Sequence, residues 1–228
     1  IEGHDAANKL SILLAHAFGK IAAPSQFLYN GITAIKKTDA ELAQQKNLKI
    51  KLVATAQKIN DSQLAAFVLP QFVEEQDELS AVSNEFNALI TESSFADKHF
   101  FKGKGAGAYP TAAAVLSDIA ALRYNYKYEY KKYLQENTPE LSNDYYLKVF
   151  VSADDIEKIN KEEFAWIEEW HNEQNNNWIV GIIQAEALQQ NDWWKQPGVS
   201  LILTKNPIVK DVEYRQIGRK SLELAGVV

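Results

Sequence analysis

Cysteine and methionine are both absent from the 228 residues of this chain. Without cysteine there is no disulfide, no thiol nucleophile and no thiolate metal site, and the composition fits a reducing compartment. The four histidines show no metal-ligand spacing, so no metal site is predicted. Methionine is missing even at position 1, and we therefore expect the chain to be part of a longer protein.

Long apolar runs and basic runs are also lacking. No apolar stretch approaches the roughly 18 residues of a membrane-spanning helix, and the first residues do not resemble a signal peptide. The net charge of −6 argues against nucleic acid as a partner, because phosphate binding requires a basic surface. Hydrophobic residues make up 46% and charged residues 24% of the chain, which predicts a globular protein with no membrane or nucleic-acid partner.

The first hundred residues alternate between helical and strand patterns. Apolar residues at helical spacing predict a helix over residues 4–19, which Gly19 ends, and a charged helix follows over 38–47. Strands are predicted over residues 48–58, 64–73, 85–93 and 96–103. Pro70 interrupts the second of these runs, which predicts an edge strand or a strand end there.

Residues 102–111 read KGKGAGAYPT and crowd three glycines into five positions. Glycines let a backbone approach a flat or charged group, and a helix predicted over residues 110–135 would present its free N–H groups behind them. The spacing G-x-G-x-G fits neither the dinucleotide fingerprint nor a Walker loop. An ordinary glycine-rich turn therefore stands as the alternative to a ligand-facing loop.

A polar stretch, ENTPELSND, predicts a linker and divides the chain into domains 1–136 and 144–228. In the second domain we predict strands over 145–152, 177–188 and 198–205 and helices over 154–174 and 211–226. The buried face of the 154–174 helix is expected to comprise Ile156, Ile159, Phe164, Ile167 and Trp170. This β-α-β-β-α order predicts a small ferredoxin-like sandwich, and the fold class is α+β.

The stretch GKGAGAYPTAAAVLSDIAAL resembles the loop and helix of homoserine dehydrogenases, whose pattern is close to G-x-G-A-G-x-x-P-T-A-x-A-V-x-x-D; the match runs from Gly103 to Asp118. EGHDAANKLSILLAHAFG is similar to the family's G-x-D-A-A-R-K-L helix, and LKIKLVATA to one of its strands. The resemblance covers about residues 1–125. It implies a mixed sheet with helices, and an oxidoreductase that interconverts L-homoserine and L-aspartate 4-semialdehyde with NAD or NADP, in threonine and methionine biosynthesis.

The resemblance also implies roles for single residues. Lys9 corresponds to the general acid/base that acts on the substrate hydroxyl, and Asp5 to a residue that contacts homoserine. Gly105, Ala106 and Gly107 would approach the cofactor near its nicotinamide. Asp5 and Lys9 lie four residues apart and so share one helix face, although an exposed ion pair on a helix has the same spacing.

Part of the expected site lies outside the chain. The family's acidic residues upstream of Gly3 and its nucleotide-binding domain would precede Ile1, so the chain looks like half of a site and is expected to be inactive or nearly so by itself. The intact enzyme is expected to be a cytoplasmic homodimer that takes L-homoserine as its small-molecule substrate.

Two departures from the family pattern leave a second hypothesis open. Asn8 stands where the family usually has arginine. Residues 144–228 occupy the place of an ACT regulatory domain, but SADDIEKIN replaces that domain's Asp-x-Pro-Gly turn. We therefore expect an ACT-like shape whose role is regulatory, structural or dimerising. The alternative for the whole chain is a non-catalytic regulatory or assembly module derived from the same scaffold.

Overall fold

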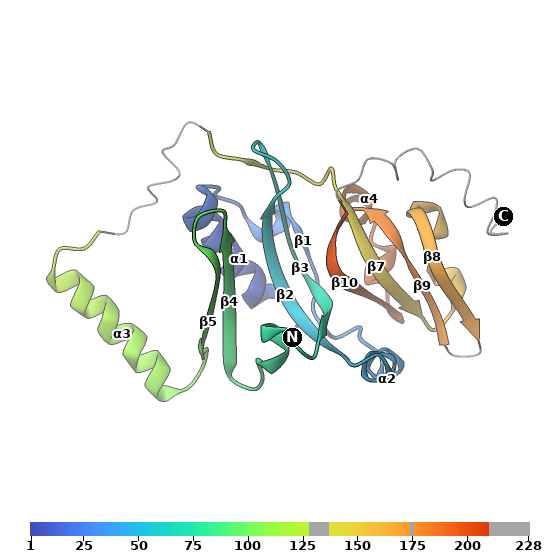
Figure 1. The fold of residues 1–228 in the computed structure, drawn as a ribbon, viewed down its shortest axis with the longest axis horizontal. Coiled ribbons are helices and arrows are strands. Elements are labelled where there is room, and N and C mark those ends of the chain that lie inside the picture. The colour runs from blue at the N-terminus through green and yellow to red at the C-terminus, as the bar shows by residue number, and fades with distance from the viewer. Residues whose placement is uncertain (128–136, 174–175, 210–228) are drawn as a thin grey trace. The chain divides into compact units, whose positions relative to one another are not determined.

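The computed structural model describes residues 1–127, 137–173 and 176–209. The chain divides into two compact units, one of residues 1–72 with 130–228 and one of residues 73–129. We call the first the main unit and the second the hairpin unit. The predicted α+β class is confirmed, because the described residues combine helices with a large mixed sheet (Figure 1).

Among the residues that the structure describes, one eight-stranded sheet organises the main unit. Its strands are β1 (Leu28–Tyr29), β2 (Leu48–Lys58), β3 (Gln63–Glu74), β6 (Glu140–Leu141), β7 (Tyr146–Ala153), β8 (Phe164–Glu173), β9 (Asn176–Gln184) and β10 (Val199–Val209). The α-helices are α1 (His4–Phe18), α2 (Lys37–Gln45) and α4 (Ala185–Gln190). Short 3₁₀ turns are η1 (Pro24–Gln26), η4 (Ile156–Lys158), η5 (Lys161–Glu163) and η6 (Trp193–Lys195).

Strand β3 lies inside this sheet and is buried on both faces. β1 and β6 pair with it in parallel, β2 also pairs with it, and β10 joins it where Leu203 meets Gln71. The prediction of an edge strand or a strand end at Pro70 is therefore wrong, since β3 also continues past it to Glu74. Pro70 falls between Val68, which pairs with β1, and Gln71, which pairs with β10, so its missing N–H interrupts neither pairing.

The alternating side chains of β3 separate two parts of the core. One set packs against α1 and consists of Leu64, Ala66 and Val68, which meet Ala7, Leu10 and Leu14 of the helix. The other set packs with the C-terminal strands and consists of Ala65, Phe67 and Leu69. The predicted helix over 4–19 and strand over 48–58 are confirmed by α1 and β2, and Gly19 caps α1 as expected.

The C-terminal strands form an antiparallel array in the order β10-β7-β9-β8 (Figure 1). Because β7 and β8 both run antiparallel to the β9 strand between them, they have the split arrangement of a ferredoxin-like sheet. The described element order is nevertheless β-β-β-α-β rather than the predicted β-α-β-β-α. An ACT-like identity stays a prediction, and the predicted helix over 211–226 lies outside the described residues.

The predicted helix over 154–174 is wrong. This stretch forms the turns η4 and η5 and then β8, which pairs with β9 from Phe164 opposite Ile183 to Glu173 opposite Asn176. Aromatic and β-branched residues favour a strand once a partner strand is present, and that tertiary contact overrides the helical spacing. Three of the expected core residues are buried all the same, namely Ile156, Ile159 and Phe164, whereas Trp170 is half exposed.

Strands from both sides of the predicted linker share the one sheet, since β10 pairs with β3, and β6 within the linker pairs with β3 as well. The division into domains 1–136 and 144–228 stays a prediction about which parts fold independently. No helix in the described part of the chain has the length and apolar character that crossing a bilayer requires.

The hairpin unit contains a turn, a two-stranded hairpin and a helix. These are η2 (Glu78–Ala81), β4 (Phe86–Ser93), β5 (Asp97–Lys104) and α3 (Ala108–Arg123). The two strands confirm the predictions for 85–93 and 96–103. The predicted 110–135 helix is too long, because α3 ends at Arg123 and Asn125 takes a left-handed backbone conformation with φ of 56°. The rest of that prediction lies outside the described residues.

Candidate functional site

Helix α1 places the two predicted substrate residues side by side. Lys9 Nζ lies 2.8 Å from Asp5 Oδ2, one helical turn away. The two side chains are 53% and 83% exposed, so the pair is well solvated and adds little to folding stability. A lysine and a carboxylate on one accessible helix face can together contact a hydroxyl group and an ammonium group of a small molecule.

The start of α1 depends on a glycine. Gly3 is the N-cap and has φ of 87°, in the left-handed region that glycine adopts without a Cβ clash. Its carbonyl accepts the first helical hydrogen bond, from Ala7 N at 2.9 Å. Asp5 then falls in the first turn, where the helix dipole favours a negative charge.

A shallow pocket lies beside the start of α1. It has a volume of about 430 Å³ and includes Glu2, His4, Tyr29, Gln189 and Lys195 in its lining. The His4 ring meets Tyr29 edge to face at 5.5 Å, and its Nε2 is 3.4 Å from the Glu2 carboxylate. The described lining residues do not include the predicted site pair, so this pocket is separate from the face that carries it.

The glycine loop belongs to the hairpin unit. Gly105 N donates a 2.8 Å hydrogen bond to Glu85 O, and a Cβ at Gly105 would lie only 2.1 Å from Asn87 Nδ2. Gly107 is the N-cap of α3 with φ of 123°, and no side chain caps the helix there. Ala106 between them is exposed.

The glycine loop is suited to contact part of a flat or charged cofactor. The loop backbone is accessible, and an uncapped helix start favours a negatively charged group. In the described residues no group of three or more histidine, aspartate or glutamate side chains is placed to hold a metal ion. The lysine–aspartate pair and the glycine loop lie in different units of the chain.

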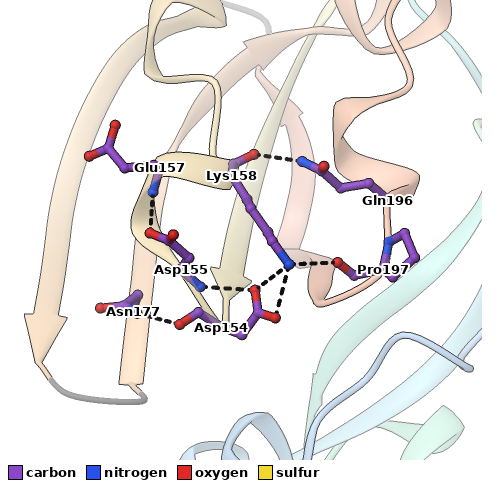
Figure 2. Close-up of polar contacts among 7 residues, drawn as sticks. All are labelled: Asp154, Asp155, Glu157, Lys158, Asn177, Gln196 and Pro197. Atoms are coloured by element: carbon purple, nitrogen blue, oxygen red, sulfur yellow. Dashed lines mark hydrogen bonds and ion pairs between the residues drawn. The ribbon is translucent and has the colours of Figure 1, made fainter.

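A separate polar cluster joins two turns of the C-terminal strands (Figure 2). Lys158 Nζ contacts both carboxylate oxygens of Asp154 at 2.9 Å and donates to Pro197 O at 3.1 Å. Asp155 caps η4 by accepting from Glu157 N at 3.0 Å. The hydrogen bond from Lys158 lowers the pKa of Asp154. Because its members bond mainly to one another, the cluster holds the turns together.

Two features were not predicted from the sequence, namely the corner that the chain forms at Asn30 and Gly31 and the buried carboxylate of Asp39. Asn-Gly is a dipeptide typical of tight turns, and this signal could have identified the corner. Asp39 accepts hydrogen bonds from Lys36 N at 2.9 Å and from Ser152 Oγ at 2.6 Å. Its second partner is 113 residues away, and nothing in the local sequence predicts that contact.

Comparison with known proteins links the first half of the chain to one family. The family model of homoserine dehydrogenase matches residues 1–120, which is more than half of the chain. The homoserine dehydrogenase of Lactococcus lactis is 38% identical over 122 residues, covering 54% of this chain and 28% of the relative. The homoserine dehydrogenase of Corynebacterium glutamicum is 37% identical over 129 residues, covering 55% of this chain and 29% of the relative.

A solved structure extends the similarity in fold beyond the matched segment. The crystal structure of a homoserine dehydrogenase from Thiobacillus denitrificans covers 90% of this chain with a TM-score of 0.66 at 19% identity, and the chain covers 53% of that structure. At this identity the likeness shows the fold alone. The chain spans less than a third of the length of the two curated relatives.

Proposed function

The chain belongs to the homoserine dehydrogenase family, and we propose that it carries the substrate half of the active site of such an enzyme. The intact protein interconverts L-homoserine and L-aspartate 4-semialdehyde by hydride transfer with NAD(P). The observation that carries this proposal is the family match over residues 1–120, which includes both the Asp5–Lys9 pair and the glycine loop.

The Asp5–Lys9 pair supports a direct role in proton transfer. Oxidation of the alcohol removes a proton from the homoserine hydroxyl and a hydride from its carbon. Lys9 Nζ takes the proton as general base and returns it in the reverse reaction, while Asp5 accepts hydrogen bonds from the substrate ammonium group and from Lys9. The 2.8 Å contact places both groups on one helix face, as this division of roles requires.

The glycine loop supports cofactor binding. NAD(P), when bound, supplies the hydride acceptor. We assign Gly105, Ala106 and Gly107 to the backbone surface that approaches the nicotinamide, because all three residues are exposed and no side chain caps α3 at Gly107. The protein contributes orientation here rather than redox chemistry.

In its full form the proposal describes a cytoplasmic homodimer that acts in threonine and methionine biosynthesis. The second predicted domain, residues 144–228, is then the ACT-like module. The chain of 228 residues is inactive or nearly so by itself, because it spans less than a third of its relatives' length and a nucleotide-binding domain outside it supplies the rest of the nucleotide site. Family membership over residues 1–120 supports the biosynthetic role, and the split arrangement of β7, β9 and β8 supports the ACT-like module.

The test is Lys9→Ala in the full-length protein, with Lys37→Ala as its matched control. Lys37 also forms an exposed ion pair one helical turn away, with Glu41 at 3.3 Å. Loss of the general base is expected to lower kcat by about 10²–10⁴-fold while the circular dichroism spectrum is retained, and Lys37→Ala should match wild type. Unchanged turnover in Lys9→Ala would instead favour the non-catalytic module.

A further inference from the structure

The segments 1–3 and 30–31 cross at direct backbone contact. A Cβ built on Gly31 would lie 2.0 Å from Ile1 O, 2.5 Å from Glu2 Cα and 2.7 Å from Glu2 C. All three atoms belong to the backbone, so no side-chain rotation can relieve the overlap. Residue 31 is therefore restricted to glycine by space, unless the segment that leads into α1 moves.

The crossing is also close, though less tight, from the other side. A Cβ on Gly3 would lie 3.0 Å from Asn30 O, and the positive φ of Gly3 adds a second reason for glycine. Ile32 N donates a 2.9 Å hydrogen bond to Ile1 O and fixes the register of the two segments. Together these contacts set the point at which α1 begins.

The corner at Asn30 and Gly31 is itself anchored in the core. Asn30 N donates to Val68 O at 2.9 Å, next to the pairing of Tyr29 with Val68. Val68 is fully buried. Asn30 Oδ1 accepts from Gly31 N at 2.9 Å and holds the corner in shape. A continuous set of contacts thus runs from the buried strand β3 to the first turn of α1.

We propose that Gly31 is a positioning residue for the Asp5–Lys9 site, acting through Gly3 and the start of α1. The inference rests on the proposed function of that pair. A side chain at position 31 would place its Cβ 2.0 Å from Ile1 O. Ile1 O must therefore move until this distance reaches at least the 3.4 Å of ordinary contact. That displacement tilts or shifts the helix end that carries Asp5, and a misplacement of about 1 Å can cost on the order of 10²-fold in rate.

The experiment uses Gly31→Ala in the full-length protein, with Ile32→Ala as the neighbouring control. The Ile32 side chain is 40% exposed, and its N–H bond to Ile1 O survives the substitution. Gly31→Ala is expected to lower kcat/KM for L-homoserine by roughly 10–100-fold, with KM for NAD(P)⁺ unchanged. Ile32→Ala should behave as wild type. Equal kinetics in the two variants would overturn the positioning role.

A double-mutant cycle with Asp5→Asn separates positioning from a general loss of stability. If Gly31 acts through the pair, Gly31→Ala should add little to the defect of Asp5→Asn, because coupled residues are not additive. Full additivity contradicts the positioning role while leaving the proposed function intact. An unchanged kcat/KM in Asp5→Asn contradicts the proposed role of Asp5 in the substrate site, and the positioning role then falls with it.

Asn30→Ala provides a second variant in case Gly31→Ala does not fold. It removes the hydrogen bond from Gly31 N to Asn30 Oδ1 without adding an atom at the crossing. The expected result is a smaller loss of kcat/KM for L-homoserine in the same direction, again absent in the Asp5→Asn background. Wild-type kinetics in Asn30→Ala would count against the corner as a positioning element.

Discussion

Ser152 Oγ donates a 2.6 Å hydrogen bond to Asp39 Oδ1, and both side chains are buried. The two residues are 113 positions apart. Asp39 lies in the first turn of α2, within the segment that matches the family model, whereas Ser152 lies on β7 beyond it. This contact therefore ties the family segment to the C-terminal strands inside one compact unit.

Ser152→Ala should lower the free energy of unfolding by about 1–3 kcal/mol, because it leaves a buried carboxylate short of a hydrogen-bond donor. Ser200→Ala is the matched control, since Ser200 pairs with Ser152 across β10 and β7 and its buried Oγ has no hydrogen-bond partner among the described residues. We expect that control to be neutral or slightly stabilising. Equal effects in urea unfolding would contradict the role of Asp39.

The Asp154–Lys158 contact predicts a dependence of stability on acid pH. The hydrogen bond from Lys158 lowers the pKa of Asp154 below its ordinary value of 3.8. The unfolded chain therefore binds more protons than the folded chain near that pH, and stability rises with pH there. This contribution is complete above the ordinary pKa and is lost as pH falls through the lowered one.

The measurement compares unfolding of wild type and Lys158→Ala across this acid range. Wild type should lose stability more steeply on acidification, because the variant has no lysine to hold the carboxylate in its charged form. Lys161→Ala serves as the charge-matched control, since the Lys161 ammonium lies over the Trp170 ring at 5.7 Å. Parallel pH profiles for wild type and Lys158→Ala would contradict this account of the cluster.

The exposed apolar side chains of α3 predict that the 228-residue chain associates with itself when it is produced alone. None of its residues is buried, and Val115, Leu116, Ile119 and Leu122 are each more than half exposed. A contiguous apolar patch of this kind favours association and dye binding. Replacing Leu116 and Ile119 by glutamate should reduce both, whereas replacing the isolated exposed Phe95 by serine should not. A monodisperse, dye-silent wild-type chain would contradict the prediction.

Asp5→Asn tests substrate binding separately from proton transfer. A hydrogen bond to a charged group contributes about 1.5–3 kcal/mol, so kcat/KM for L-homoserine should fall by roughly 10–100-fold. Glu41→Gln is the control, because Glu41 occupies the corresponding place in the exposed Lys37 pair. An effect confined to KM for NAD(P)⁺ would contradict the assignment of Asp5 to the substrate.

Short sequence patterns correctly predicted those helices and strands whose formation depends on neighbouring residues in the sequence. The apolar spacing of residues 4–19 and the glycine after it gave α1, and with it the shared face of Asp5 and Lys9. The alternation over 48–58 gave β2. In these stretches the periodicity and the end signals agree, so the prediction needs no knowledge of the partner elements.

Contacts between segments far apart in the sequence determined the features that these patterns did not predict. Residues 154–174 carry apolar side chains at helical spacing, yet pairing with β9 makes much of the stretch a strand. Pro70 predicted an edge strand. In the structure β1 and β10 pair with β3 on either side of Pro70 along the strand, so a proline is tolerated in the interior of the sheet. The crossing of Gly31 over Ile1 likewise depends on where β3 holds the corner, which the sequence of the corner does not reveal.

The central claim is tested most directly by adding L-homoserine to the full-length protein with NAD⁺ or NADP⁺ and following absorbance of the reduced nicotinamide. The account predicts homoserine-dependent reduction with at least one nucleotide, and its loss in Lys9→Ala but not in Lys37→Ala. A folded full-length protein that reduces neither nucleotide would contradict the assignment as an enzyme and leave the chain as a module of the same scaffold.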